Sequence, residues 1–311
     1  MTTVSVVIPC YRSESTLPAL ASQLVPELEQ LRRAGTVDEF EIVLIVDGSP
    51  DRAAEVARSL SAADDRIRVL ELRRNFGQHN ALMAGIRAAR FETVVTMDDD
   101  LQHRPDQIGL MLAALDASTD LVYGIPDVEE HGAVRSAASR FIKWSLRLAG
   151  VPNAGMVGAF RAFRTELRDG FAAVDDPHVN LDVVLSWVTA DVRAQRVTMD
   201  RRQEGGSNYR FRGLVRHAMN MITGYGTVPL RLATYLGLLC GVLGLVLLAI
   251  VLVQFFIGVT TVPGFTTTIA VVALFASAQM IAIGIIGEYL GRQHFRSMQR
   301  PMYVVRETPR G

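Results

Sequence analysis

The first 125 residues of the chain predict an α/β fold with a Rossmann-like, mostly parallel sheet. Short runs rich in β-branched residues alternate there with helical patterns, which is typical of parallel sheets covered by helices. Two further observations predict a membrane anchor: no charged residue lies between Leu232 and Gly287, and an amphipathic segment precedes that stretch. The expected organisation is a cytoplasmic domain over 1–205, an interfacial helix region over 206–231, two transmembrane helices within 232–290 and a cytoplasmic tail over 291–311.

The elements of the first domain follow one another in a regular order. The expected strands are Val4–Pro9, Glu41–Val46, Ile67–Leu72, Thr93–Met97 and Asp120–Tyr123, and helices are expected near 14–33, 51–62, 79–90 and 105–117. The first helix carries an apolar stripe with helical spacing, formed by Leu17, Leu20, Leu24, Leu28 and Leu31. Gly35 is its expected end and Pro26 an expected bend. Ligands of doubly wound sheets bind beyond the carboxyl ends of the strands, where polar residues stand in this sequence.

Residues 126–205 are less regular, with a basic helix-like stretch over 135–147 and a glycine-rich piece at 150–158. A clearer pattern follows them. Its apolar face is formed by Phe211, Leu214, Val215, Ala218, Met219, Ile222 and Tyr225, opposite Arg212, Arg216 and His217. This pattern favours a helix in the membrane interface, and an ordinary packed surface helix is the alternative.

The uncharged stretch is long enough for two membrane spans, because one span needs about 20 apolar residues. We expect the spans at about 232–258 and 267–288, joined by a turn that contains Pro263 and Gly264. Arginines cluster before the first span and after the second, so the positive-inside rule places both termini in the cytoplasm. The pairs Gly237/Gly241 and Gly287/Gly291 have the spacing of close helix contacts. These glycine faces suggest a homo-oligomer, whereas a buried hairpin in a soluble core is the alternative to the spans.

Charge and cysteine content exclude some classes of protein. Lys+Arg and Asp+Glu are each 32, so the formal net charge is zero, and the basic excess typical of nucleic-acid binders is lacking. Cys10 and Cys240 are the only cysteines and predict no disulfide framework, which fits a reducing compartment. The N-terminal sequence lacks a basic flank before a long apolar core, so we do not expect a signal peptide.

Three consecutive carboxylates, Asp98–Asp100, follow the expected strand Thr93–Met97 directly. They repel one another, so a half-buried cluster favours a bound cation. Alternate residues at a strand end point the same way, which lets Asp98 and Asp100 act together while Asp99 faces elsewhere. Hard oxygen ligands suit Mg²⁺ or Mn²⁺, and such an ion bridges diphosphate oxygens. The alternative is a solvated acidic loop before the helix that starts near Pro105.

A second polar turn runs from Asp47 to Asp51 after the strand Glu41–Val46. An Asp at a strand end can accept hydrogen bonds from a base or a ribose. Taken alone, these residues favour the alternative, an ordinary β–α turn with Asp51 near a helix N-cap.

Together these segments resemble the family-2 glycosyltransferases of the GT-A fold. The segments VSVVIPCYRSE, EIVLIVDGSPD, LRRNFGQHNALMAGI and VVTMDDDLQHRPDQI have the order and spacing of that family. The dolichol-phosphate-mannose-synthase-like and bacterial polyprenyl-phosphate branch is resembled by GAFRAFRTEL, RRQEGGSNYRFRGLVRHAMNMITGYGTVPLRL, the two spans and GEYLGRQHFRSMQRPMYVVRE. The resemblance covers nearly the whole chain. It implies metal-dependent, inverting transfer of a sugar from a UDP- or GDP-linked donor to an undecaprenyl, decaprenyl or dolichyl phosphate, for cell-envelope glycans at a bacterial plasma membrane.

The resemblance also implies roles for single residues. The nucleotide-sugar pocket would be lined by Pro9, Tyr11, Glu14, Asp47, Asp98 and Asp99, with Asp47 at the base. Mg²⁺ or Mn²⁺ would be held by Asp100 and Gln102, which match the pattern D-x-D-x-Q, together with Asp98. The catalytic residues Arg201 and Arg202, and Ser207 at the lipid phosphate, fall in the segment that approaches the diphosphate and the acceptor in relatives. Arg135 and Arg140 are further candidates for the lipid phosphate, although basic residues on a membrane-facing helix are more often surface contacts.

One position departs from the family pattern. Many relatives carry an Asp before Phe160-Arg161, where this chain has Ala159. Asp182 is the other candidate for a catalytic base, and a helix-start residue is the alternative. The departure matters little for the chemistry, because a phosphate monoester with a second pKa near 6 is largely a dianion at neutral pH. Such an acceptor needs positioning more than deprotonation.

Two other functions compete with this one. A processive polysaccharide synthase is disfavoured because no Q-x-x-R-W motif occurs and two spans do not easily form a polymer channel. A membrane scaffold or sugar-nucleotide sensor on a degenerate transferase fold is favoured only by Ala159. The presence of Asp47, Asp98, Asp100 and Gln102 argues against it.

Overall fold

The computed structural model describes residues 2–127, 144, 146–147, 151–200, 225, 228–257, 264–298 and 300–306. The predicted catalytic residues Arg201 and Arg202 and the predicted lipid-phosphate-binding residues Arg135, Arg140 and Ser207 lie outside the described residues. Most of the predicted interfacial helix region lies outside them as well.

A seven-stranded sheet forms the centre of the first domain, with the strand order β3-β2-β1-β4-β6-β5-β7. The strands are β1 (Thr2–Cys10), β2 (Val37–Val46), β3 (Ile67–Glu71), β4 (Thr93–Thr96), β5 (Leu121–Pro126), β6 (Arg161–Arg164) and β7 (Val192–Val197). Only β6 runs against its neighbours β4 and β5, and the other pairs are parallel. The prediction of a mostly parallel α/β sheet is therefore confirmed. Strands β6 and β7 were not predicted from the sequence.

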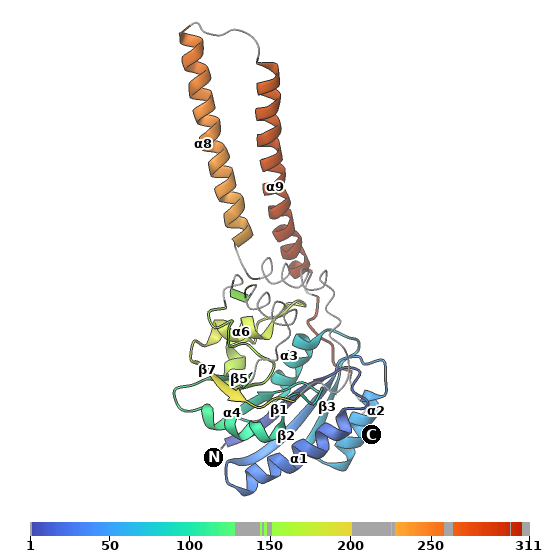
Figure 1. Ribbon diagram of the computed structural model, residues 1–311. Helices are drawn as coiled ribbons and strands as arrows, with labels where there is room; N and C mark the ends of the chain where they lie inside the picture. Colours follow the sequence, from blue (N-terminus) through green and yellow to red (C-terminus); the bar gives the residue numbers. More distant parts are fainter. Residues whose placement is uncertain are drawn as a thin grey trace.

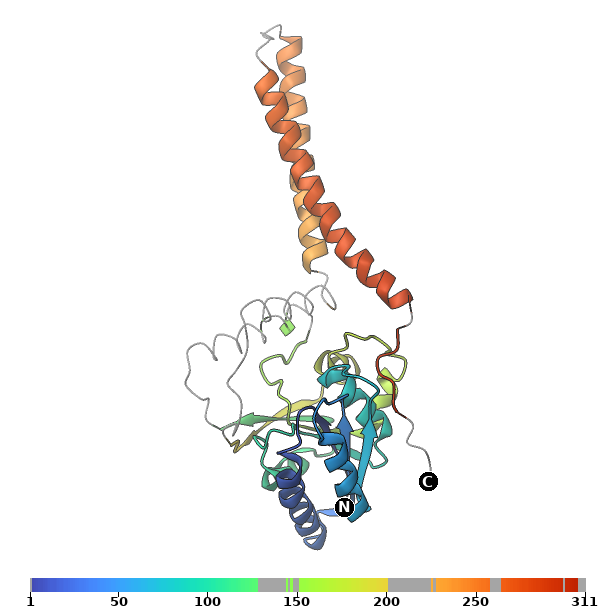
Figure 2. The ribbon, with the colours of Figure 1, turned by 90° about the vertical axis from the view of Figure 1, so that its right-hand side faces the viewer.

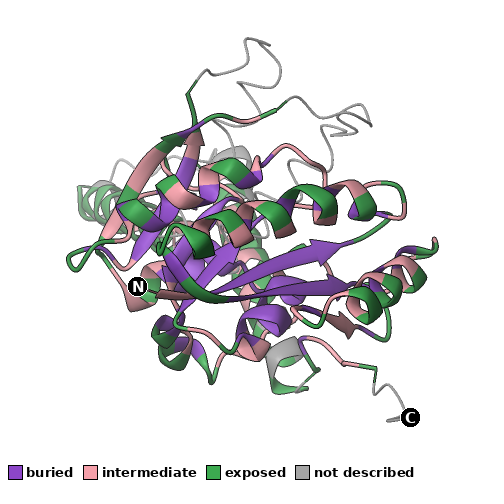
Figure 3. Cartoon of the chain, turned by 90° about the horizontal axis from the view of Figure 1, so that it is seen from below, coloured by how far each residue is buried: buried purple, intermediate pink, exposed green. Residues whose placement is uncertain are grey.

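Helices cover both faces of this sheet (Figure 1). They are α1 (Leu17–Arg33), α2 (Ala53–Ala63), α3 (Gln78–Ala88), α4 (Ile108–Ala114) and α6 (Leu181–Val188), with 3₁₀ turns η1 (Pro105–Gln107) and η2 (Thr165–Phe171). The first face packs against α1, α2 and α4, and the second against α3 and α6. Seen from below, the buried residues gather in the sheet, and the helices turn exposed residues outward (Figure 3).

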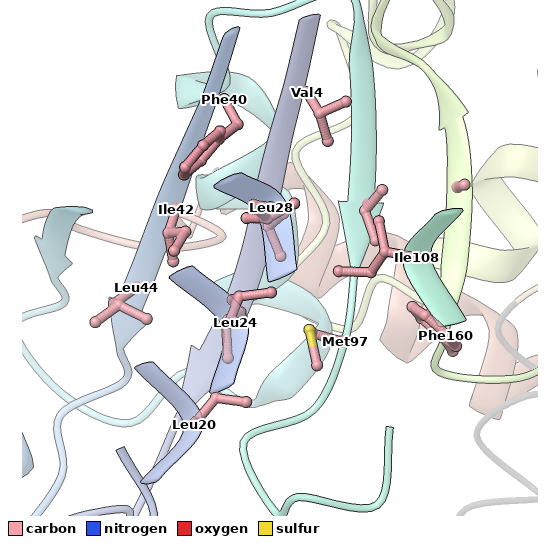
Figure 4. Close-up of a cluster of buried hydrophobic side chains, with 14 of the residues drawn as sticks. Val4, Leu20, Leu24, Leu28, Phe40, Ile42, Leu44, Met97, Ile108 and Phe160 are labelled. Atoms are coloured by element: carbon pink, nitrogen blue, oxygen red, sulfur yellow. The ribbon is translucent and has the colours of Figure 1, made fainter. Parts of the chain in front are cut away.

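The leucine stripe of α1 packs on the sheet as predicted. Leu20, Leu24 and Leu28 are buried against apolar side chains of β1 and β2 (Figure 4). The helix ends in a Schellman motif at Gly35, whose φ is 73°. The amide of Thr36 donates to the carbonyl of Leu31 at 3.0 Å, and that of Gly35 to Arg32 at 3.1 Å. Gly35 therefore ends the helix, as expected.

Two long helices follow the sheet domain and project from it as a hairpin (Figures 1 and 2). They are α8 (Val228–Phe256) and α9 (Phe265–Ser297), and both are long and apolar enough to cross a membrane. Both extend beyond the spans expected from hydropathy, α8 by four residues at its start and α9 into the Arg-rich segment. The apolar surfaces of the helices are largely exposed, with Leu245 68% and Leu238 66% accessible. Such surfaces need a lipid or protein environment.

The glycines of the hairpin differ in what they face. Gly244 lies against the ring of Phe275 on the other helix, so a Cβ there would meet the ring at 3.3 Å. At Gly237, Gly241, Gly287 and Gly291 no atom of the described chain lies within 4 Å of a Cβ position. Self-association through these glycine faces stays a prediction.

Candidate active site

The carboxyl ends of β1, β2 and β4 meet at one edge of the sheet, and the predicted polar residues gather there. Asp99 joins the turns after β4 and β1, because its Oδ2 accepts from the hydroxyl of Ser13 and from the amide of Tyr11 at 3.3 Å. The turns after β1 and β2 are joined by the amide of Arg12, which donates to Oγ of Ser49 at 2.7 Å. Three turns from distant parts of the sequence thus form one surface.

The backbone of this surface contains two residues in the left-handed region. Arg12 has a φ of 60° and Leu101 a φ of 62°. Residues other than glycine adopt this backbone region at a cost in free energy, and such residues cluster at binding sites. Both stand in the turns that carry the predicted ligand-binding side chains.

Asp47 lies buried at the end of β2 and is held by the loop before α3. Its two carboxylate oxygens accept from the amides of Phe76 at 2.7 Å and Gly77 at 2.8 Å. Burial raises the pKa of Asp47, and the two amides and the charge of Arg74 oppose that rise. Both oxygens have backbone partners, so in this arrangement Asp47 holds the loop before α3 against the end of β2.

Asp98 is held from both sides of the turn after β4. Its Oδ1 accepts from Nε2 of Gln78 at 2.7 Å, at the first residue of α3. Its amide donates to Nδ1 of His103 at 3.0 Å. Burial lowers the pKa of His103 to about 4, so the ring is neutral at physiological pH and Nδ1 is free to accept. His103 also stacks on Phe160 with ring centroids 5.3 Å apart, which fixes the turn.

The three carboxylates Asp98–Asp100 share one turn, but their surroundings differ. Burial raises the pKa of Asp99 to about 6, the bonds from Ser13 and Tyr11 oppose that rise, and the charges of Asp98 and Asp100 add to it. Asp100 accepts from the amide of Gln102 at 3.2 Å. As expected from alternation, Asp99 turns toward β1. Three carboxylates crowded into one turn favour a nearby cation.

The donor set at this turn fits Mg²⁺ or Mn²⁺. Among the residues that the structure describes, no three acidic, His or Cys side chains form an all-protein metal cage. Mg²⁺ is typically bound by one or two carboxylates together with substrate phosphates, and it keeps several waters. Asp98, Asp100 and the side-chain carbonyl oxygen of Gln102 offer this kind of partial ligand set, which the donor diphosphate would complete. The metal assignment stays a prediction.

The segment before Arg201 lies along the acidic turn. His103 forms an isolated antiparallel bridge with Met199, and the amide of Asp200 donates to the carbonyl of Gln102 at 2.9 Å. Asp200, the last described residue of this segment, therefore lies beside the predicted metal ligand Gln102.

The position of Ala159 lies against the strand that carries the acidic turn. Its carbonyl accepts from Oγ1 of Thr96 and from Nη1 of Arg161, both at 3.0 Å. Arg161 extends from there to Asp182, whose carboxylate accepts two bonds at 2.7 and 2.9 Å. The hydroxyl of Tyr123 donates a third at 3.0 Å. Burial alone would raise the pKa of Asp182, but the charge and bonds of Arg161 lower it.

Asp182 is thus engaged in a buried ion pair near the start of α6, where Asn180 supplies the N-cap. The helix-start alternative describes its position, and no contact in the structure tests a role as a base.

Two of the residues predicted to line the nucleotide-sugar pocket are engaged or covered. Glu14 pairs with Arg52 at 2.8 Å, and Pro9 is buried within β1. Tyr11 remains 43% exposed.

Sequence reasoning missed the residues that hold the predicted ones. Ser13, Gln78 and His103 all stand inside family-like segments, but nothing in their spacing shows which carboxylate each one meets. Arg161 was named only as part of a motif. Its partner Asp182 is far enough away in the sequence that the pairing emerges only in the fold.

Comparisons with known proteins identify the family of the chain. The model described as Glycosyl transferase family 2 matches residues 5–169, and the one described as GtrB C-terminal hairpin matches 228–293. Over 309 residues the chain is 30% identical to the undecaprenyl-phosphate 4-deoxy-4-formamido-L-arabinose transferase of Proteus mirabilis, covering 98% of this chain and 93% of that protein. The enzyme of the same description from Pseudomonas fluorescens is 30% identical over 311 residues, with 99% and 90% covered.

A solved structure supports the fold. Glucosyl-3-phosphoglycerate synthase from Mycobacterium tuberculosis, in complex with Mn²⁺, UDP-glucose and phosphoglyceric acid, aligns with a TM-score of 0.52 at 16% identity, covering 72% of this chain and 79% of that one. The GT-A prediction for the fold is therefore confirmed. The chain belongs to glycosyl transferase family 2, and it is a glycosyltransferase with a GtrB C-terminal hairpin.

Proposed function

We propose that the protein transfers a sugar from a UDP- or GDP-linked donor to a polyprenyl phosphate, of the undecaprenyl type, with inversion at the anomeric carbon. The relatives of about 30% identity are named for undecaprenyl phosphate as acceptor. The sugar in their names belongs to those enzymes alone. The product would be a polyprenyl-monophosphate sugar for cell-envelope glycans.

One structural observation carries this proposal: both ends of the hairpin join the domain at the side of the sheet that holds the acidic turn. Before α8, the hydroxyl of Tyr225 accepts from the amide of Asn180 at 2.7 Å. After α9, Val305 pairs with Leu72, directly beyond the carboxyl end of β3. A lipid phosphate at the membrane surface would therefore meet the turn at Asp98–Asp100.

The chain's own residues would bind and orient the two reactants. Asp47, Asp99 and Tyr11 would position the nucleotide, and Asp98, Asp100 and Gln102 would hold Mg²⁺ or Mn²⁺. The ion, when bound, supplies charge neutralisation to the departing diphosphate. Arg201 and Arg202 would add positive charge near the same group, and Arg135, Arg140 and Ser207 would receive the lipid phosphate.

The acceptor needs little help from a base in this scheme. A phosphate monoester is largely a dianion at neutral pH, so the main demands are alignment and stabilisation of the leaving group. The engagement of Asp182 by Arg161 and the presence of Ala159 are both compatible with such a reaction.

We further propose that α8 and α9 span the bacterial plasma membrane, with the catalytic domain and both termini in the cytoplasm. The arginines that flank the hairpin on its domain side support this orientation.

The test is incubation of membranes containing the full-length protein with a panel of radiolabelled nucleotide-sugars and undecaprenyl phosphate. We expect label in the organic extract for one donor, its loss with EDTA, and its return with excess Mg²⁺ or Mn²⁺. Asp100→Ala should abolish transfer and leave membrane insertion unchanged. Asp65→Ala, at an exposed carboxylate outside the site, is the matched control and should transfer normally. Full activity of Asp100→Ala would refute the metal assignment.

A further inference from the structure

The chain returns to the catalytic domain after it leaves α9 (Figure 2). Met302 is only 1% exposed and packs in the core between the sheet, α3 and α6. Its amide donates to Oδ1 of Asp175 at 3.1 Å. Four residues earlier, Met298 is 55% exposed. The segment 301–306, here called the return segment, is therefore anchored in the domain by one buried side chain.

The return segment also pairs with the edge of the sheet. β3 is the outermost strand on its side, and Val305 forms an antiparallel bridge with Leu72 just beyond it. The amide of Arg306 donates to the carbonyl of Glu71 at 2.6 Å, and the amide of Arg73 donates to that of Val304 at 2.9 Å. These bonds give partners to backbone groups that an edge strand would otherwise leave open.

The pairing of the return segment with the sheet edge ends at the loop Arg73–Gly77. The loop Arg73–Gly77 runs from the last paired residue to the start of α3, and its amides at Phe76 and Gly77 hold the carboxylate of Asp47. The same loop packs tightly on the turn after β2. A Cβ on Gly48 would lie 2.2 Å from the carbonyl carbon of Arg74, so the backbones of the loop and the turn are in close contact.

We propose that the return segment positions the loop Arg73–Gly77 and, through its amides, Asp47, so that the cytoplasmic end of α9 helps to shape the donor pocket. Met302, Val304 and Val305 are positioning residues in this scheme. The inference rests on the proposed function in one respect, namely that Asp47 belongs to the nucleotide-sugar pocket.

If the return segment only stabilised the domain, the kinetic results would differ. Loss of general stability lowers the folded fraction and with it the apparent kcat, and it leaves KM unchanged. Loss of loop positioning loosens the loop amides and raises KM for the donor, because the pocket must be ordered at the expense of binding energy.

The first experiment is hydrogen exchange of the full-length protein in lipid nanodiscs without substrate. We compare Met302→Ala with Met302→Leu, which refills the apolar site, and with Met298→Ala, which shortens an exposed methionine nearby. Met302→Ala should speed amide exchange in peptides covering 73–77 about tenfold or more, on the scale at which local opening follows lost contacts. Met302→Leu and Met298→Ala should exchange like the wild type. Unchanged exchange at 73–77 in Met302→Ala would overturn the proposal, whether or not exchange at 301–306 becomes faster.

A second variant avoids the core. Asp175 is exposed, so Asp175→Ala removes the acceptor for the amide of Met302 with little risk to folding, and Asp175→Asn retains an oxygen. We expect faster exchange at 73–77 in the first and not in the second. With the donor that the panel identifies, Met302→Ala should raise KM several-fold and change kcat by less than about twofold. Exchange is measured without donor, so an absence of transfer in the wild type would refute the proposed function and leave the test of the return segment intact.

Discussion

Arg161 and Asp182 form a bidentate ion pair in the interior of the domain, with their side chains only 4% and 5% exposed. The guanidinium bridges the antiparallel strand β6 and the first turn of α6, and its third nitrogen reaches the carbonyl of Ala159. Asp98 also contributes, through its charge, to a raised pKa of Arg161, after the larger effects of burial, which lowers it, and of Asp182. The pair therefore connects α6 with the strand that precedes the acidic turn.

Asp182→Asn should destabilise the protein more than it impairs catalysis. Removing one partner of a buried pair leaves an uncompensated charge and costs about 3 to 5 kcal/mol. The double variant Arg161→Met/Asp182→Leu should regain much of that loss, and both free energies of unfolding are measurable by urea titration. Asp120→Asn is the matched control, since the pair of Asp120 and Arg164 is partly exposed and is worth about 1 kcal/mol or less. Unchanged stability with turnover lost would instead assign Asp182 as the base.

Gly48→Ala should disrupt the nucleotide site, and Gly35→Ala should not. Both glycines have a positive φ, of 56° and 73°, so each alanine costs about 1 to 2 kcal/mol of backbone strain. Only at Gly48 does a Cβ also meet backbone, at Arg74 and Asn75, whereas Gly35 faces open space. We expect Gly48→Ala to weaken binding of UDP or GDP, whichever the wild type binds, at least tenfold. Equal affinities of the two variants would contradict the close packing of these turns.

His103 should make the protein less stable in acid. Burial lowers its pKa from 6.5 to about 4, so between these values the unfolded chain takes up a proton and the folded protein does not. Stability is therefore present above pH 6.5 and is lost as the pH falls toward 4. The loss from His103 between pH 7 and pH 5 should be about 2 kcal/mol.

The measurement is urea unfolding of the wild type and of His103→Asn at both pH values in EDTA. The side-chain oxygen of the asparagine can still accept from the backbone amide of Asp98. The variant should lose about 2 kcal/mol less than the wild type over this interval. An identical pH dependence of the two proteins would show that His103 is protonated at an ordinary pKa.

The fold was predictable wherever the residue pattern within a segment determines its secondary structure. Val4–Pro9 and Glu41–Val46 read as strands because both of their faces are buried, and α1 followed from its leucine spacing. β6 was missed because Arg161 and Arg164 stand at its ends; an arginine reads as surface until the fold supplies Asp182. The return segment was missed for a related reason, since its single buried residue, Met302, forms no pattern and its partners lie far away in the sequence.

The candidate site was also predictable only in part. Strand ends predicted the meeting of Tyr11, Asp47 and Asp98–Asp100, because a parallel sheet places these ends at one edge. The hydrogen bonds from Ser13, Gln78 and the amides of Phe76 and Gly77 could not be predicted, since each depends on the exact path of a loop.

The orientation of the hairpin can be tested with reporter fusions in bacteria. Alkaline phosphatase, which is active only outside the cytoplasm, should be inactive when fused after Gly311 and active when inserted at 259–263. A green fluorescent protein fused at the same two sites should give the reverse pattern. Activity of the C-terminal phosphatase fusion would contradict the proposed orientation.

The most direct test of the proposed function is the intact mass of the lipid product. Purified full-length protein in nanodiscs, with undecaprenyl phosphate, Mg²⁺ and each nucleotide-sugar in turn, should convert the lipid to a species heavier by one glycosyl residue. The product should carry a single phosphate, and a nucleoside diphosphate should be released in equal amount. A product heavier by a sugar phosphate, or release of nucleotide without any change in the lipid across the whole panel, would contradict transfer to the lipid phosphate.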